Sequence, residues 1–145
     1  NTPEFSKSNV TEVSKVIEDF GPDIIITHVA QDSHPEHRAT FAIVSSSVVT
    51  SRINHGKPKL LLCANTYNEI CLDGVFNPNV YVDVSGYFDT KMSAIEMHKS
   101  QPFQMWKKIA TNQDVLLGSR LSDVKYAEGF LQVPILGKLA NLSLF

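Results

Sequence analysis

Two histidines and two acidic residues are concentrated in one short segment of this chain, at residues 32–37. His34 and His37 are three residues apart, so both imidazoles can point into one cleft if a helix begins between them. Such a pair can bind a divalent metal, or one ring can bind it while the other acts as an acid. Asp32 and Glu36 can orient the rings and fix their tautomers. The segment therefore predicts a metal or acid site, and surface histidines on a solvated loop are the alternative.

The elements around this segment would present it to a ligand. Residues 23–28 contain a continuous apolar run that predicts a buried strand with both faces covered. Pro35 suits the first turn of a helix, and apolar residues at helical spacing carry that helix to about Ile53. The histidines would then lie above the carboxyl end of a strand, where open α/β sheets bind ligands.

Further patterns predict an α/β protein. A first helix is expected from a cap at Ser8 or Asn9 to a stop at Gly21-Pro22, and residues 59–64 read as a second apolar strand. Strand, helix and strand make a right-handed crossover with a parallel pair. The remaining predicted elements are an edge strand at 80–84, helices at 89–98 and around 106–118, and a last strand at 126–133.

Helical spacing also predicts which side chains are buried. In the first helix Val16, Ile17 and Phe20 are expected to face the core and Ser14 the solvent. In the last helix the apolar positions are Trp106, Ile109, Val115 and Leu116. Residues 65–79 are expected to be loop.

Composition and charge argue against several classes of protein. The 145 residues are 43% hydrophobic with a formal net charge of -2, which indicates one globular domain or a large part of one. Basic residues form no patch, so nucleic acid is not an expected partner. No apolar run approaches the roughly 18 residues that span a membrane and no leader is visible, so a cytoplasmic location is expected. Cys63 and Cys71 fit no zinc-ribbon or redox spacing.

The histidine segment resembles a family of enzymes. The pattern Pro22-Asp23, an apolar strand, Thr27-His28 and then Asp32-x-His34-Pro35-Glu36-His37-Arg38-Ala39-Thr40 is similar to the zinc-dependent N-acetylglucosamine deacetylases of the LmbE and PIG-L type. Three later segments look like further signatures of this family, in the same order. They are Phe76-Asn77-Pro78-Asn79-Val80-Tyr81-Val82-Asp83-Val84, Lys91-x-x-Ala94-x-x-x-His98-x-Ser100-Gln101 and Tyr126-Ala127-Glu128-Gly129-Phe130.

The resemblance implies a Rossmann-like fold, with a mostly parallel sheet flanked by helices, and Zn²⁺ as the cofactor. It implies that His37 binds the zinc and that His34 stands beside the reacting carbonyl as an electrostatic stabiliser or general acid. Amide hydrolysis needs a polarised carbonyl, an activated water and a proton for the departing amine, so this division is chemically reasonable. The candidates to support these groups or to contact the substrate are Asp32, Glu36, Tyr126, Glu128 and His98.

Two departures from the family pattern are visible. Glu36 stands where the family more often has Asp. The family's Ala-His-Pro-Asp-Asp-Glu-type loop, which supplies two zinc ligands and the general base, does not occur in these residues. A catalytic zinc site usually has three protein ligands, and His37 and His34 together can provide only two. Residues 1–145 are therefore expected to form the C-terminal portion of a single LmbE-like domain that lacks its first strands. We expect an N-terminal portion to complete it, or else a homo-oligomer.

Two classes of function stay open from the sequence. The first is a zinc-dependent hydrolase that removes the N-acetyl group from an N-acetylglucosamine-type sugar or glycoconjugate. The alternative is a non-catalytic carbohydrate-binding or interaction module of the same fold. Tightly held zinc and a co-purifying N-terminal piece would favour the enzyme, whereas a metal-free single chain would favour the module.

Overall fold

The computed structural model describes residues 3–64 and 69–142, and the chain divides into two compact units. Unit 1 comprises Asn1–Pro78 and Phe130–Phe145, and unit 2 comprises Asn79–Gly129. The histidine segment belongs to unit 1. The expectation of a single deacetylase domain stays a prediction.

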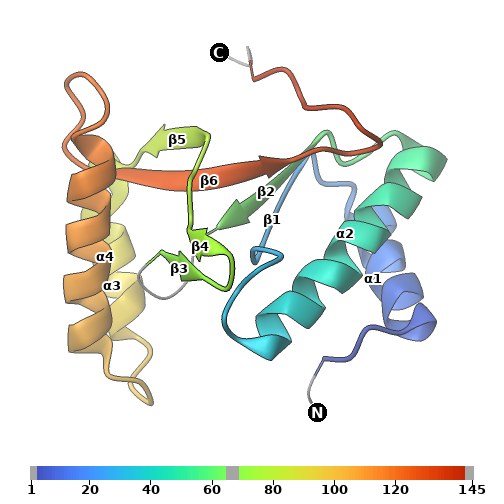
Figure 1. Cartoon of the computed structure of the whole chain (residues 1–145), viewed down its shortest axis with the longest axis horizontal. Helices are drawn as coiled ribbons and strands as arrows, with labels where there is room; N and C mark the ends of the chain where they lie inside the picture. The colour runs from blue at the N-terminus through green and yellow to red at the C-terminus, as the bar shows by residue number, and fades with distance from the viewer. Residues whose placement is uncertain (1–2, 65–68, 143–145) are drawn as a thin grey trace. The chain divides into compact units, whose positions relative to one another are not determined.

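Unit 1 is built from a sheet and a pair of helices (Figure 1). α1 (Lys7–Phe20) and α2 (Pro35–His55) pack against each other, while β1 (Ile24–Thr27) and β2 (Leu60–Ala64) run parallel. The later part of β6 (Ala127–Val133) pairs antiparallel with β2. The predicted α/β fold, with a parallel pair of strands flanked by helices, is confirmed.

Two buried clusters hold unit 1 together. The first joins both helices to the sheet and consists of Ile17, Val48, Leu61 and Ile135. The second joins the loop after β1 to β2 and consists of Val29, Cys63 and Phe76. Because Val29 of this loop belongs to the second cluster, the backbone just before the histidine segment is fixed in the core.

α1 begins earlier than expected and ends where expected. The Ser6 hydroxyl accepts a hydrogen bond from the Asn9 N–H at 3.1 Å, so Ser6 caps the helix and the predicted cap at Ser8 or Asn9 was wrong. At the other end Gly21 adopts the left-handed conformation with φ of 63°, which a helix-terminating glycine adopts without steric cost. The predicted stop at Gly21 is confirmed.

Small serine side chains fill part of the contact between α1 and α2. Ser14 is buried, whereas Val16 and Phe20 are 67% and 82% exposed, so the predicted orientation of these three residues was wrong. Ser47 of α2 is fully buried, and its hydroxyl donates to the Val10 carbonyl of α1 at 3.0 Å. The apolar stripe misleads here because short side chains let the helices approach closely on the serine-bearing side.

β1 is an edge strand of the sheet, and it is not covered on both faces as its apolar run predicts. Ile25 packs on the first buried cluster, but Ile24 and Ile26 point to the other face and are 49% and 57% exposed. A continuous apolar run is equally compatible with a strand covered on both faces and with a strand that has one uncovered face, so the run alone did not separate the two.

A short hairpin lies within the segment expected to be loop. β3 (Ile70–Cys71) and β4 (Gly74–Val75) pair antiparallel, and residues 65–68 lie outside the described part of the chain. In the turn between them, the Leu72 N–H donates to the Gln31 carbonyl at 2.8 Å. The hairpin is thereby attached to the loop that follows β1.

Unit 2 contains α3 (Phe88–Glu96) and α4 (Phe103–Gly118), which lie side by side (Figure 1). The short helix η1 (Ser85–Tyr87) precedes α3, and β5 (Val80–Asp83) is an edge strand next to β6, as predicted. Asp114 and Leu117 of α4 are buried, whereas Val115 and Leu116 are half exposed, so the predicted apolar side was wrong at these two positions. Among the described residues, the helices are too short or too polar to cross a membrane.

Candidate functional site

One buried carboxylate, that of Asp32, holds the histidine segment together. Its Oδ1 accepts from the His34 backbone N–H at 2.8 Å and its Oδ2 contacts Nδ1 of His37 at 3.0 Å, while the residue is 2% exposed. Because a carboxylate only accepts hydrogen bonds, Nδ1 of His37 carries the proton and Nε2 is the nitrogen whose lone pair can bind a metal. Metal-binding histidines in proteins commonly have this carboxylate partner.

His34 caps α2 with its own ring. The Glu36 N–H donates to Nδ1 of His34 at 3.3 Å, so Nδ1 carries no proton and Nε2 carries it in the neutral ring. Pro35 occupies the first helical position, where no backbone N–H is required. The predicted placement of His34 just before the helix and of His37 in its first turn is confirmed. The centroids of the two rings are 4.7 Å apart and the rings are tilted by 32°.

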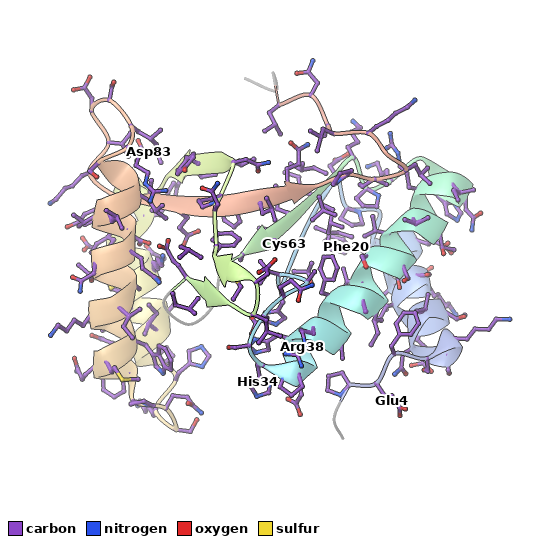
Figure 2. All side chains as sticks on the ribbon, in the orientation of Figure 1. Glu4, Phe20, His34, Arg38, Cys63 and Asp83 are labelled. Carbon is purple, nitrogen blue, oxygen red and sulfur yellow. The ribbon has the colours of Figure 1, made fainter. Side chains whose placement is uncertain are left out.

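Arg38 fixes the loop that leads into α2. Its Nη1 donates to the carbonyls of Asp32 at 2.7 Å and Ser33 at 3.0 Å. Figure 2 shows His34 and Arg38 together at the amino end of α2. The loop is therefore held by Arg38 on its backbone and by Asp32 through its side chain, and both contacts keep the two rings in one place.

His28 belongs to the same cluster, although no sequence pattern assigned it a role. It follows β1 directly, and its ring stacks on that of His37 with centroids 3.9 Å apart and planes 1° from parallel. Burial lowers the pKa of His28 and the charge of a protonated His37 acts in the same direction, so the neutral ring is favoured. The sequence feature that could have identified His28 as a site residue is its position at the carboxyl end of a parallel strand.

The cluster could hold a metal ion. His28, Asp32 and His37 each offer one ligand atom, and these atoms lie within 4.8 Å of one another. Imidazole nitrogens and a carboxylate oxygen are donors that suit zinc. The Asp32 oxygens already bond to the His34 N–H and to Nδ1 of His37, so further ligands are needed for a complete site. The donor chemistry therefore fits the predicted cofactor.

Glu36 contacts the His34 ring through its backbone. Its N–H is the donor to the His34 ring, and its carbonyl accepts from the Thr40 hydroxyl at 2.8 Å. A role for the Glu36 carboxylate in orienting the rings stays a prediction.

The other three predicted site residues belong to unit 2. The Tyr126 ring stacks on Phe88 with centroids 3.6 Å apart, and Glu128 forms an ion pair with Lys91 at 2.6 Å. His98 is exposed in the turn after α3. Tyr126 and Glu128 thus have partners that stabilise unit 2, and their role toward a substrate stays a prediction.

Lys91 lies between two carboxylates in unit 2. Its Nζ is 2.8 Å from both carboxylate oxygens of Asp114 and also pairs with Glu128. Burial raises the pKa of Asp114, Lys91 opposes that rise and the charge of Glu128 adds to it. The Lys91 cluster, formed by Lys91, Asp114 and Glu128, connects α3, α4 and β6.

Solved structures share this fold. They include GalB, the 4-carboxy-2-hydroxymuconate hydratase of Pseudomonas putida, with a TM-score of 0.74 and 16% identity over 90% of this chain and 60% of that chain. The N,N'-diacetylchitobiose deacetylase of Pyrococcus horikoshii has a TM-score of 0.69 and 21% identity over 95% of this chain and 56% of its own. A conserved protein of Thermus thermophilus has a TM-score of 0.71 and 21% identity over 92% and 62%.

These similarities establish the fold and not the activity. No family model matches the chain. The three proteins include both a hydratase and a deacetylase, at identities that show a common architecture alone. The chain spans 56% to 62% of their lengths. A shared fold does not determine function, which depends on the chemistry of the histidine cluster.

Proposed function

We propose that this chain is part of a zinc-dependent deacetylase of the LmbE and PIG-L type, acting on an N-acetylglucosamine-type sugar or glycoconjugate. The observation that carries the proposal is the double contact of Asp32 with the His34 backbone and the His37 ring. Asp32 fixes the His37 ring with its lone pair on Nε2, and the Glu36 N–H fixes the neighbouring His34 ring with its proton on Nε2. The proposed zinc-dependent amide hydrolysis uses both a metal ligand and a hydrogen-bond donor.

Each residue has a distinct part in the proposed reaction. When bound, zinc polarises the amide carbonyl and activates a water molecule. His37 would hold the metal through Nε2, and Asp32 would keep its ring in the required tautomer. His34 would donate its Nε2–H to the carbonyl oxygen as negative charge develops there, while its Nδ1 stays bonded to the Glu36 N–H.

We also propose that a segment outside these residues supplies further zinc ligands and pairs with β1. Two observations support this: the exposed Ile24 and Ile26 on an edge strand, and solved structures that are longer than the chain. A parallel strand added beside β1 would pair with its open edge and end close to His28, because the histidine cluster follows the carboxyl end of β1. A helix connected to that strand would cover Ile24 and Ile26. A cytoplasmic location is part of the same proposal.

The proposal is tested by acetate release from an N-acetylglucosamine oligosaccharide. We expect a chelator to abolish turnover of the purified protein and added zinc to restore it. His34→Ala should lower kcat on the order of 10²–10³-fold and keep the zinc, because the ring donates to the reacting oxygen. His37→Ala should lose the zinc.

His55→Ala is the matched control, because His55 is exposed, lies at the far end of α2 and pairs with Glu18. Its kinetics and zinc content should equal those of the natural protein. Loss of zinc with His34→Ala but not with His37→Ala would reverse the two roles. A zinc-loaded protein without deacetylase activity, but with affinity for the sugar, would favour the binding module.

A further inference from the structure

We infer that His28 positions the metal ligand His37 by stacking on its ring and is not itself a ligand of the same ion. The inference rests on the proposed metal-binding role of His37. It adds to the site a residue whose contact is with another side chain and not with the metal or the substrate.

The stack and the hydrogen bond restrain His37 in complementary ways. Asp32 holds one edge of the ring through Nδ1, at 3.0 Å. His28 lies flat against one face, with centroids 3.9 Å apart and planes 1° from parallel. Rotation of the His37 ring about its Cβ–Cγ bond would break the hydrogen bond and also drive ring atoms into His28. Together the two contacts define the direction in which Nε2 points.

The parallel planes argue against His28 as a second ligand. A metal lies in the plane of the imidazole that binds it, at about 2.0–2.1 Å from the nitrogen. Stacked rings cannot approach closer than van der Waals contact, about 3.5 Å. An ion in the plane of His37 would therefore stay about 3.5 Å from the plane of His28, beyond bonding distance. The proximity of the two rings thus reflects packing and not convergence on one ion.

His28 is well placed to act as a fixed surface. It follows β1 directly, and its chain neighbours Thr27 and Val29 are both buried. Val29 belongs to the second buried cluster, so the backbone on that side is anchored to the core. A ring carried by this backbone restrains its neighbour better than a ring on an exposed loop would.

Zinc affinity separates positioning from ligation. His28→Phe keeps a flat ring and removes both nitrogens, whereas His28→Ala removes the ring. We expect His28→Phe to bind zinc within about threefold of the natural protein and His28→Ala to bind it 10–100-fold more weakly, the usual effect of removing a partner of a ligand. Equal, large losses in both variants would mean that a nitrogen of His28 is needed, which would overturn the inference. An unchanged affinity in His28→Ala would overturn it as well.

A second measurement does not depend on zinc. Nitrogen NMR of the metal-free protein reports which nitrogen of His37 carries the proton. We expect a single tautomer, protonated at Nδ1, in the natural protein and in His28→Phe, and a mixture in His28→Ala. A single His37 tautomer in the natural protein and in both variants would overturn the inference, whether or not the protein binds zinc. If the protein does not bind zinc, that result by itself counts against the proposed function. Circular dichroism establishes that each variant is folded, and His55→Ala serves again as the control.

Discussion

The side chain of Asp32 accepts hydrogen bonds on both oxygens, from a backbone N–H and from a ring, at the point where a loop becomes a helix. We predict that Asp32→Asn keeps the fold and weakens zinc binding by roughly 10–100-fold. An amide can still accept from the His34 N–H, but its NH₂ group would donate to Nδ1 of His37. The ring proton would then move to Nε2, the nitrogen that the metal needs.

Zinc titration against a competing chelator and thermal denaturation together check this prediction. Stability should fall by about 1–3 kcal/mol, the cost of impairing a buried charged hydrogen bond. Asp89→Asn, at an exposed position in the first turn of α3, is the matched control and should leave zinc affinity unchanged and lower stability by less than about 1 kcal/mol. An unchanged zinc affinity in Asp32→Asn would show that the carboxylate does not control the ring.

At the residue scale, the sequence predicts part of this site. Pro35 and the spacing of the two histidines place His34 before a helix and His37 in its first turn, and the structure agrees. The stacking of His28 on His37 could not be predicted, because it depends on the path of the four-residue turn between β1 and Asp32. Local spacing determines which face of a helix a residue occupies, but not which loop residue returns to that face.

Among the helices, α1 and α2 bury several serine hydroxyls, some with a hydrogen-bond partner and some without. Among the described residues, the hydroxyls of Ser14 and Ser51 have no hydrogen-bond partner, whereas that of Ser47 donates to the carbonyls of Val10 and Ile43. We predict that Ser51→Ala raises the free energy of unfolding by about 0.5–1 kcal/mol, because it removes an unpaired buried hydroxyl and favours helix.

Ser47→Ala is the comparison, since it removes a hydroxyl of the same size that is paired. It should lower the free energy of unfolding by about 1 kcal/mol, the usual net value of a hydrogen bond. Urea denaturation of both variants measures the difference. If both substitutions destabilise equally, the hydroxyl of Ser51 has a partner after all.

The Lys91 cluster makes the stability of unit 2 depend on pH. Lys91→Met would leave the buried Asp114 without its cation, and we predict a loss of about 1–3 kcal/mol at pH 7. The raised pKa of Asp114 means that the folded state binds its proton more tightly than the unfolded state, so this group adds stability as pH falls through its folded pKa toward 3.8. Removing Lys91 raises that pKa further.

The deficit of Lys91→Met should therefore be smaller at about pH 5 than at pH 7. Chemical denaturation at both values tests this. Lys107→Met, which breaks an ion pair with the more exposed Glu96, should change stability by less than about 1 kcal/mol at either pH. A deficit in Lys91→Met that does not vary with pH would exclude Asp114 as its source.

The positions of the helices and strands could be predicted better than which of their side chains are buried. Gly21-Pro22 and the apolar runs before and after α2 predict the strand, helix and strand of unit 1. The hairpin at 70–75 was missed because its strands have two residues each, too few to show alternation. Val16 and Phe20 were misplaced because the partner helix offers serines on the opposite side, which the sequence of α1 alone does not reveal.

For the whole molecule, the edge strand β1 is the feature that most affects association with other chains. Its edge position and its exposed Ile24 and Ile26 predict association with a further chain segment or with a second copy. Native mass spectrometry of the purified protein should show the 16.1 kDa chain together with such a partner. A stable 16.1 kDa monomer that binds zinc and deacetylates a sugar unaided would contradict this part of the account.

In the proposed site His37 binds zinc while His34 does not. Anomalous X-ray diffraction at the zinc absorption edge, from crystals of the purified protein grown with zinc, tests it most directly. We predict one peak about 2.0–2.1 Å from Nε2 of His37, with Asp32 still bonded to Nδ1 and with His34 and His28 outside bonding distance. A peak bonded to His34, or no peak near either ring in zinc-saturated crystals, would contradict the account.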